Sequence, residues 1–134
     1  MGIASTIAIS GLNAASLRLQ VAASNIANSR SDGPLPDAAH AGNFPVAYTP
    51  LRVNQTDVAG GGTNAAVTAI SPATVSTFDP TAPFANSSGM VASPNVDLTS
   101  EYVQLLAARL SYAANAAVMR ADAQMSAALL NITA

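Results

Sequence analysis

Three residue types are missing from this sequence: cysteine, lysine and tryptophan. Without cysteine the chain can form neither disulfides nor thiolate metal sites. Its only strong cations are five arginines, which are spread from Arg18 to Arg120 and form no patch. Nucleic acids and anionic membrane surfaces bind clustered Lys and Arg, so the sequence excludes both as the main partner.

Charged and aromatic residues are scarce as well, at 9% and 4% of 134 residues. Half of the residues are hydrophobic, but many of these are alanines. Burying an alanine removes little apolar area from water, so a compact core built from this chain alone would be thin for its length.

Long apolar runs are absent too. No stretch approaches the roughly 20 residues that a membrane-spanning helix needs, so we expect no direct membrane insertion. The start, "MGIASTIAISGLNAAS", has no basic leader followed by an apolar run. We therefore expect no cleaved signal peptide.

Residues that could carry chemistry are few. The single histidine, His40, lies in "PDAAHAGNF" without a second histidine or a cysteine to share a metal, and a solvated loop residue is the better interpretation. The "GGGTN" stretch is a poor phosphate loop in a chain without lysine. We expect no catalytic, metal or cofactor site, and no enzyme.

The chain divides into three segments. Residues 1–29 and 97–134 show apolar residues at helical spacing, and residues 30–96 contain all eight prolines. Within this middle segment, "GGG" at 60–62 separates two β-prone runs and predicts a hairpin, whereas 78–89 is expected to be loop. The expected fold is mainly α: two long terminal helices packed as a coiled-coil-like pair, joined by a small irregular and β-hairpin segment.

Both helices carry apolar stripes that are too wide for one partner helix. Either other chains cover the remaining faces, giving a multi-subunit assembly, or the middle segment closes a monomeric core, and composition leaves both open. The residues expected at an assembly interface are Ile7, Leu12, Leu19, Ile26, Val103, Leu106, Leu110, Tyr112 and Met125.

Polar residues mark the helix ends. Asn25 and Asn28 lie one turn apart where the first pattern stops, and asparagine competes for free backbone groups and tolerates the left-handed conformation at a C-cap. We interpret the pair as ending the helix and fixing the angle at which the chain leaves it. Asp97 is placed to cap the second helix, and Pro94 keeps the preceding segment extended.

Two stretches resemble a known family. "IAISGLNAASLRLQVAASNIANS" (7–29) resembles the N-terminal signature of bacterial flagellar axial proteins, and "DPTAPFANSSGMVASPNVDLTSEYVQLLAARLSYAANAAV" (79–118) is similar to the block before the last helix of the FlgC family of proximal-rod proteins. Arg109 stands one position earlier than the arginine usual in that family, and the lack of lysine is also unusual. The matching positions are Ser10, Gly11, Arg18, Asn25, Asn28, Pro94, Asn95, Asp97, Glu101, Tyr112 and Asn115.

The resemblance implies a structural subunit of the flagellar basal-body proximal rod, which polymerises through its terminal helices into the drive shaft that transmits torque across the periplasm. It implies type III export, helices that fold fully only on assembly, and no cofactor. The implied partners are further copies, other rod proteins, basal-body ring proteins and export-gate adaptor proteins. Two alternatives are another axial or adaptor subunit of the flagellum or a related type III export system, and a soluble helical binding module.

Overall fold

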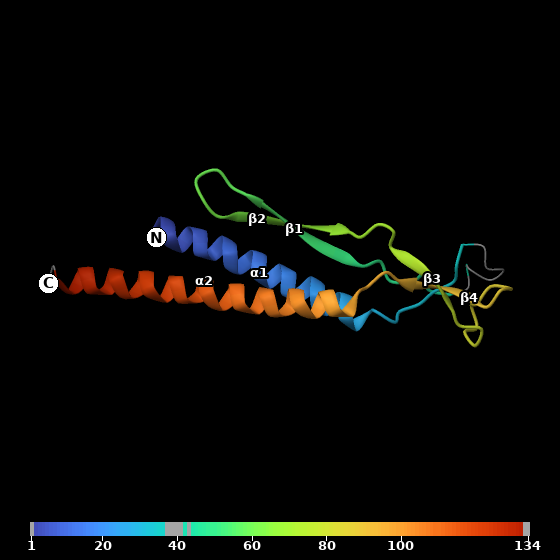
Figure 1. Cartoon of the computed structure of the whole chain (residues 1–134). Helices are drawn as coiled ribbons and strands as arrows, with labels where there is room; N and C mark the ends of the chain where they lie inside the picture. Colours follow the sequence, from blue (N-terminus) through green and yellow to red (C-terminus); the bar gives the residue numbers. More distant parts are fainter. Residues whose placement is uncertain (1, 37–41, 43, 133–134) are drawn as a thin grey trace.

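The computed structural model describes residues 2–36, 42 and 44–132, and His40 lies outside them. The elements follow the order α1 (Ile3–Ala27), β1 (Leu51–Asp57), β2 (Thr63–Ala69), β3 (Thr74–Phe78), β4 (Met90–Pro94) and α2 (Leu98–Ile132). The molecule is elongated, with α1 and α2 side by side and antiparallel (Figure 1). Both chain termini lie at one end, and β3 and β4 lie at the other (Figure 1).

The first helix, α1, buries small residues. Ala8, Ala15 and Ala22 recur at intervals of seven along it and are almost completely buried. This spacing returns them to one face after nearly two turns, and that face lies against α2. The helix expected within residues 1–29 is present and covers all but two residues at each end of that segment.

The second helix, α2, is longer and far less covered. Its 35 residues span about 52 Å at 1.5 Å per residue. Asp97 caps its first turn, since the Asp97 Oδ1 accepts a hydrogen bond from the Thr99 amide at 3.0 Å. All of α2 is described, and Ala108 is its one buried residue. Most of this helix therefore faces solvent in the single chain.

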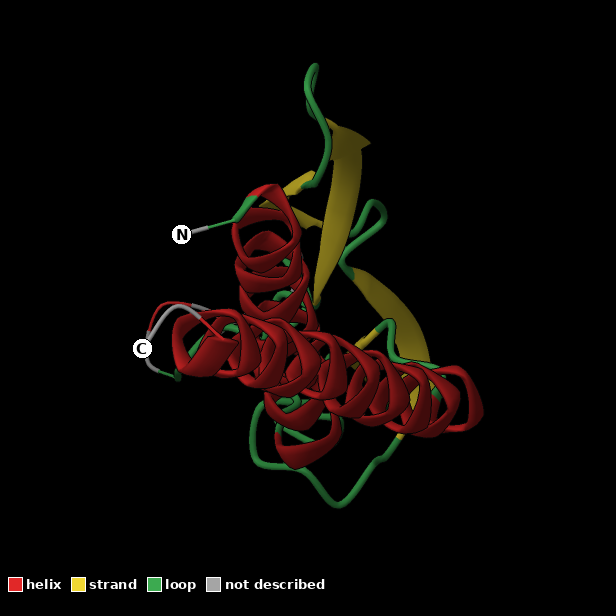
Figure 2. Ribbon diagram, turned by 90° about the vertical axis from the view of Figure 1, so that its left-hand side faces the viewer, coloured by secondary structure: helices red, strands yellow, loops and turns green. Residues whose placement is uncertain are grey.

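The two helices approach each other through small side chains. Gly11 shows how closely: a Cβ at this position would lie 2.6 Å from the Asn115 side chain. The helices are inclined to each other (Figure 2). The expected pairing of the terminal helices is confirmed, whereas packing of the coiled-coil type stays a prediction.

The expected hairpin is present. Strands β1 and β2 pair antiparallel from Leu51↔Ala69 to Asp57↔Thr63. Gly60, Gly61 and Gly62 at the tip all have positive φ angles between 93° and 101°, which residues with a side chain rarely adopt. The hairpin folds back along α1 (Figure 1).

A second hairpin was not expected. Strands β3 and β4 pair from Thr74↔Pro94 to Phe78↔Met90, and Gly33 forms an isolated bridge to Ala92. Residues 79–89 connect the strands as the loop that was expected. The two strands are short, and one ends in proline, so their β signal is weak at the sequence level. Their pairing needs a contact between segments that the sequence separates by a long loop.

Candidate assembly site

Asn25 joins three elements. Its side chain is fully buried, and it uses its whole hydrogen-bonding capacity of two donors and two acceptors. The Asn25 Nδ2 donates to the Leu51 carbonyl and to the Glu101 Oε1, each at 2.7 Å. The Asn25 Oδ1 accepts from the Leu51 amide and from the Tyr48 hydroxyl, each at 3.0 Å. One amide therefore ties α1 to the start of β1 and to the first turn of α2.

Asn28 has a different task from Asn25. Its Nδ2 donates to the Ser24 carbonyl at 2.9 Å, and its backbone amide bonds to the same carbonyl at 3.0 Å. It caps α1 with φ −104° and ψ 12°, outside the left-handed region. The capping uses side-chain competition for a free carbonyl and not the left-handed conformation that asparagine tolerates. Asn28 ends the helix, and Asn25 anchors the returning chain.

Further motif positions also make contacts within the chain. The Ser10 hydroxyl donates to the Ile7 carbonyl at 2.7 Å and accepts from the Thr63 amide at 3.1 Å, which fixes the tip of the hairpin on α1. The Gly11 backbone meets Asn115, as described above. The Ser10–Thr63 and Gly11–Asn115 contacts each join a residue of α1 to a segment more than fifty residues away in the sequence.

The approach to α2 is similarly fixed. Pro94 ends β4 and is buried, and Asn95 follows it. The Asn95 Nδ2 donates to the Pro72 carbonyl at 3.0 Å, and the Asn95 amide donates to the Ala73 carbonyl at 2.9 Å. Asp97 then caps α2. This short run sets the position from which α2 starts.

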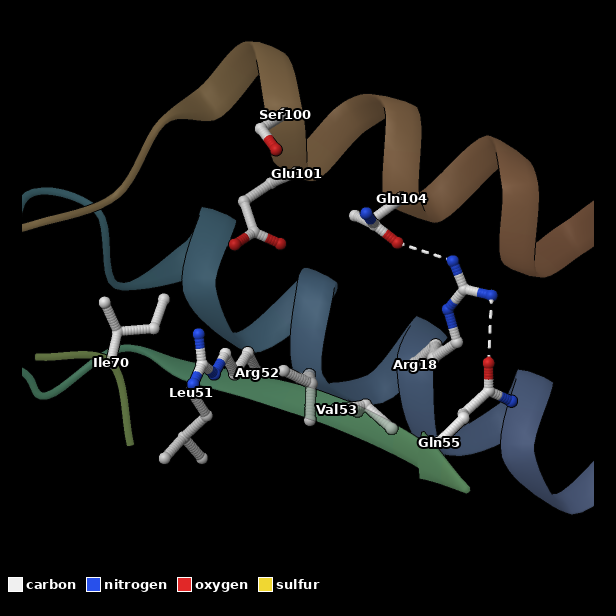
Figure 3. A pocket seen from close by; sticks show the side chains of 10 residues that line it. Arg18, Leu51, Arg52, Val53, Gln55, Ile70, Ser100, Glu101 and Gln104 are labelled. Carbon is white, nitrogen blue, oxygen red and sulfur yellow. Dashed lines mark hydrogen bonds between the residues drawn. The ribbon is translucent and has the colours of Figure 1, made fainter. Parts of the chain in front are cut away.

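Arg18 lies in a groove between α1, α2 and β1 (Figure 3). Its guanidinium donates to the Gln104 Oε1 at 2.6 Å and to the Gln55 Oε1 at 3.5 Å. The groove has a volume of about 370 Å³. Arg52, Glu101 and Ser100 also line it.

The expected interface residues lie mostly on the surface. Leu12 and Ile26 are half-buried, and the other seven are exposed: Ile7, Leu19, Val103, Leu106, Leu110, Tyr112 and Met125. On α2, Val103, Leu106 and Leu110 follow helical spacing and lie roughly half a turn around the axis from Ala108, which faces α1. We call these three residues and Met125 the outer seam. The structure brings two pairs of motif residues together, Asn25 with Glu101 and Gly11 with Asn115, and leaves the outer seam without cover.

Some contacts in the structure were not predicted from the sequence. Tyr48, Leu51 and Gln104 complete the network around Asn25 and Arg18, and the Ser5 hydroxyl donates to the Asp122 carboxylate at the far end of the helix pair. For Asn25 a signal existed, because it is in phase with Ala8, Ala15 and Ala22 and so falls on a buried position. No local sequence pattern indicates that Tyr48 would contact Asn25 or that Gln104 would contact Arg18.

No metal or membrane feature stands out in the part of the chain that the structure describes. Over residues 2–36, 42 and 44–132, no three His, Asp or Glu residues gather where a metal ion could be held. Over the same residues, no helix is both long enough and apolar enough to cross a bilayer.

Comparison with known proteins identifies the relatives of this chain. The family described as flagella basal body rod protein matches residues 6–34, and the family described as flagellar basal body rod FlgEFG protein C-terminal matches residues 87–132. The flagellar basal-body rod protein FlgC of Agrobacterium fabrum is 32% identical over 98% of this chain and 94% of its own length. The chain belongs to the FlgC family of flagellar basal-body rod proteins.

Other FlgC proteins agree. FlgC of Yersinia enterocolitica is 40% identical and FlgC of Salmonella typhimurium 38% identical, each over 84% of this chain and 83% of the relative. The family of rod proteins is structural, which confirms that this chain is not an enzyme. One matched segment of this chain contains Asn25 and the other contains its partner Glu101, and between them the two segments cover most of the helix pair.

Proposed function

We propose that this protein is a structural subunit of the flagellar proximal rod and that α1 and α2 polymerise it into the drive shaft across the periplasm. The observation that carries the proposal is the outer seam. Leu110 is 72% exposed, Leu106 is 57% exposed and Val103 is 59% exposed. Exposed apolar side chains that continue along one helix face mark a surface that buries itself against another molecule.

The shortage of charge suits this role. Within α2 the charged residues are Glu101, Arg109, Arg120 and Asp122, and none belongs to the outer seam. A charge buried between subunits needs a partner to offset its desolvation. A seam without charge can pack against several neighbouring helices without this requirement.

The location and partners follow from the same role. The protein works in the flagellar basal body, among further copies and other rod proteins. We propose that it also meets basal-body ring proteins and export-gate adaptor proteins, and that it reaches the rod by type III export without a cleaved signal peptide. Torque would pass through many repeated contacts and not through one site.

The seam is tested by placing the same new side chain on two faces of α2. L110Q introduces a polar amide into the outer seam, and R109Q introduces it one residue away on a different face. We expect a strain that carries only L110Q to lose swimming, because the amide would be buried without its hydrogen bonds, at a cost of about 1–3 kcal/mol per contact repeated in every copy. The R109Q strain should swim.

Two measurements separate folding from assembly. Circular dichroism of both purified variants should match the parent chain, because both positions are exposed in the monomer. Basal bodies are then isolated and assayed for the variant subunit. Normal incorporation of L110Q would show that the seam is not an interface, and absence of the unmodified chain from basal bodies would reject the rod role and favour a soluble binding module.

A further inference from the structure

The groove around Arg18 contains more positive charge than its partners neutralise. Arg18 and Arg52 line it, with Glu101 as the one acid among its lining residues. Glu101 already accepts the hydrogen bond from Asn25. The groove lies at the junction of α1, α2 and β1 (Figure 3).

Arg18 is oriented without being neutralised. Its two hydrogen-bond partners, Gln55 and Gln104, are neutral amides on opposite sides of the guanidinium (Figure 3). A guanidinium has five N–H donors, so three remain after these two bonds. Held in this way, the group loses little further side-chain entropy when an anion binds.

Arg52 adds a second cation from β1. Among the described side chains, none forms a hydrogen bond or ion pair with Arg52. Guanidinium groups bind carboxylates through parallel N–H···O bonds. The Arg52 guanidinium lies near Ile70 and Glu101, at the opposite end of the groove from the Arg18 guanidinium (Figure 3), so Arg52 is the group with its N–H donors free for an incoming carboxylate.

The rest of the chain supplies the complementary charge. Two of the five arginines and one of the seven acids line the groove, which leaves three arginines and six acids elsewhere. The groove is therefore a positive site on an otherwise acidic molecule. In a helical assembly each copy presents the same groove and the same excess of acidic residues to its neighbours, so a head-to-tail contact can repeat along the polymer.

We propose that the groove lined by Arg18 and Arg52 binds an acidic side chain of a second copy of this chain. The inference rests on the proposed rod function and adds a polar contact that is separate from the apolar outer seam. Electrostatic contacts of this kind fix register between subunits more than they add affinity.

The absence of lysine allows a direct test. R52K places the only lysine of the chain in the groove and keeps its positive charge. A carbodiimide activates carboxylates, and an amine in contact with an activated carboxylate displaces the urea and forms an amide bond. The reagent is applied to isolated basal bodies that contain R52K, with R109K on the exposed face of α2 as the matched control.

We expect a dimer-sized product from R52K that is absent from R109K, and mass spectrometry should locate the amide between position 52 and an Asp or Glu of a second copy. A link only to Glu101 of the same chain, a link to a different rod protein, or no link at all would each overturn the proposal. If the unmodified chain is itself missing from basal bodies, that result rejects the proposed rod function, on which the groove proposal rests.

A second pair of variants tests the same contact without a crosslinking reagent. R52E reverses the charge at the groove and should repel the incoming carboxylate, so less R52E than R109E should co-purify with basal bodies. Both positions are exposed, so both monomers should keep the circular dichroism spectrum of the parent. Equal incorporation of R52E and R109E would contradict the proposal.

Discussion

At the scale of single residues, the positions that resemble the family motif make contacts mainly within the chain. Asn25 illustrates this, because a polar residue at a buried position is acceptable only when all its hydrogen bonds are made. Its amide meets both backbone groups of Leu51, much as a neighbouring strand would, and reaches Glu101 as well. The side chain therefore sets both the start of β1 and the position of α2.

Replacing Asn25 should lower the free energy of unfolding strongly. N25A removes four hydrogen bonds and leaves the Leu51 backbone and Glu101 without their partner in a buried place, so we expect a loss of about 3 kcal/mol in the free energy of unfolding. N28A removes a capping bond near the surface and should cost about 1 kcal/mol. Denaturant unfolding followed by circular dichroism measures both, and equal losses would refute the assignment of separate roles.

At the scale of elements, each helix depends on what lies at its ends and along its face. The helix α1 begins at Ile3, its N-cap residue Gly2 provides no side-chain cap, and α2 and the β1–β2 hairpin support it. The helix α2 has the Asp97 cap but little cover. Because few side chains of α2 are buried, the hydrogen bond from the Asp97 cap should matter more for the stability of the first turn of α2 than it would in a well-covered helix.

The cap can be tested with a matched pair. D97A removes the acceptor for the Thr99 amide and should lower the free energy of unfolding by about 1 kcal/mol. D97N keeps a side-chain oxygen that caps nearly as well, so it should remain close to the parent. Thermal melts of the two variants give the comparison, and a D97N chain as unstable as D97A would point to the negative charge and not to the hydrogen bond.

At the scale of the whole molecule, the two helices differ in length. Ser5 meets Asp122 near the start of α1, so residues 123–132 of α2 extend beyond the point where α1 begins. These residues include Leu129 and Ile132, which are 67% and 81% exposed. A helix end with few buried contacts opens more easily than a packed segment, so this end of α2 should fray in the single chain.

Hydrogen exchange should report this difference along α2. In the purified monomer we expect the amides of residues 124–132 to exchange much faster than those of residues 105–119, which lie against α1. In isolated basal bodies the two groups should become similarly protected. Slow exchange throughout α2 in the monomer would mean that the helix is stable without neighbours.

Part of this protein could be derived from the sequence. Apolar spacing and cap residues gave both helices to within a residue or two, because these signals are local, and the glycines at 60–62 marked the first hairpin. The β3–β4 hairpin and the partners Tyr48, Leu51 and Gln104 could not be derived. Each depends on bringing together segments that are far apart in the chain, and no short-range pattern records such a meeting.

The sequence by itself also determined that the apolar stripes of both helices would be wider than one partner helix can cover, since alanine-rich helices with wide stripes follow from composition and spacing. Only the tertiary structure decided which stripe stays open. Gly11 and the small residues of α1 let α2 approach through Ala108 and Asn115, and this contact turns Leu106 and Leu110 outward. The choice of face depends on close packing between two helices, which is a property of their pairing and not of either helix alone.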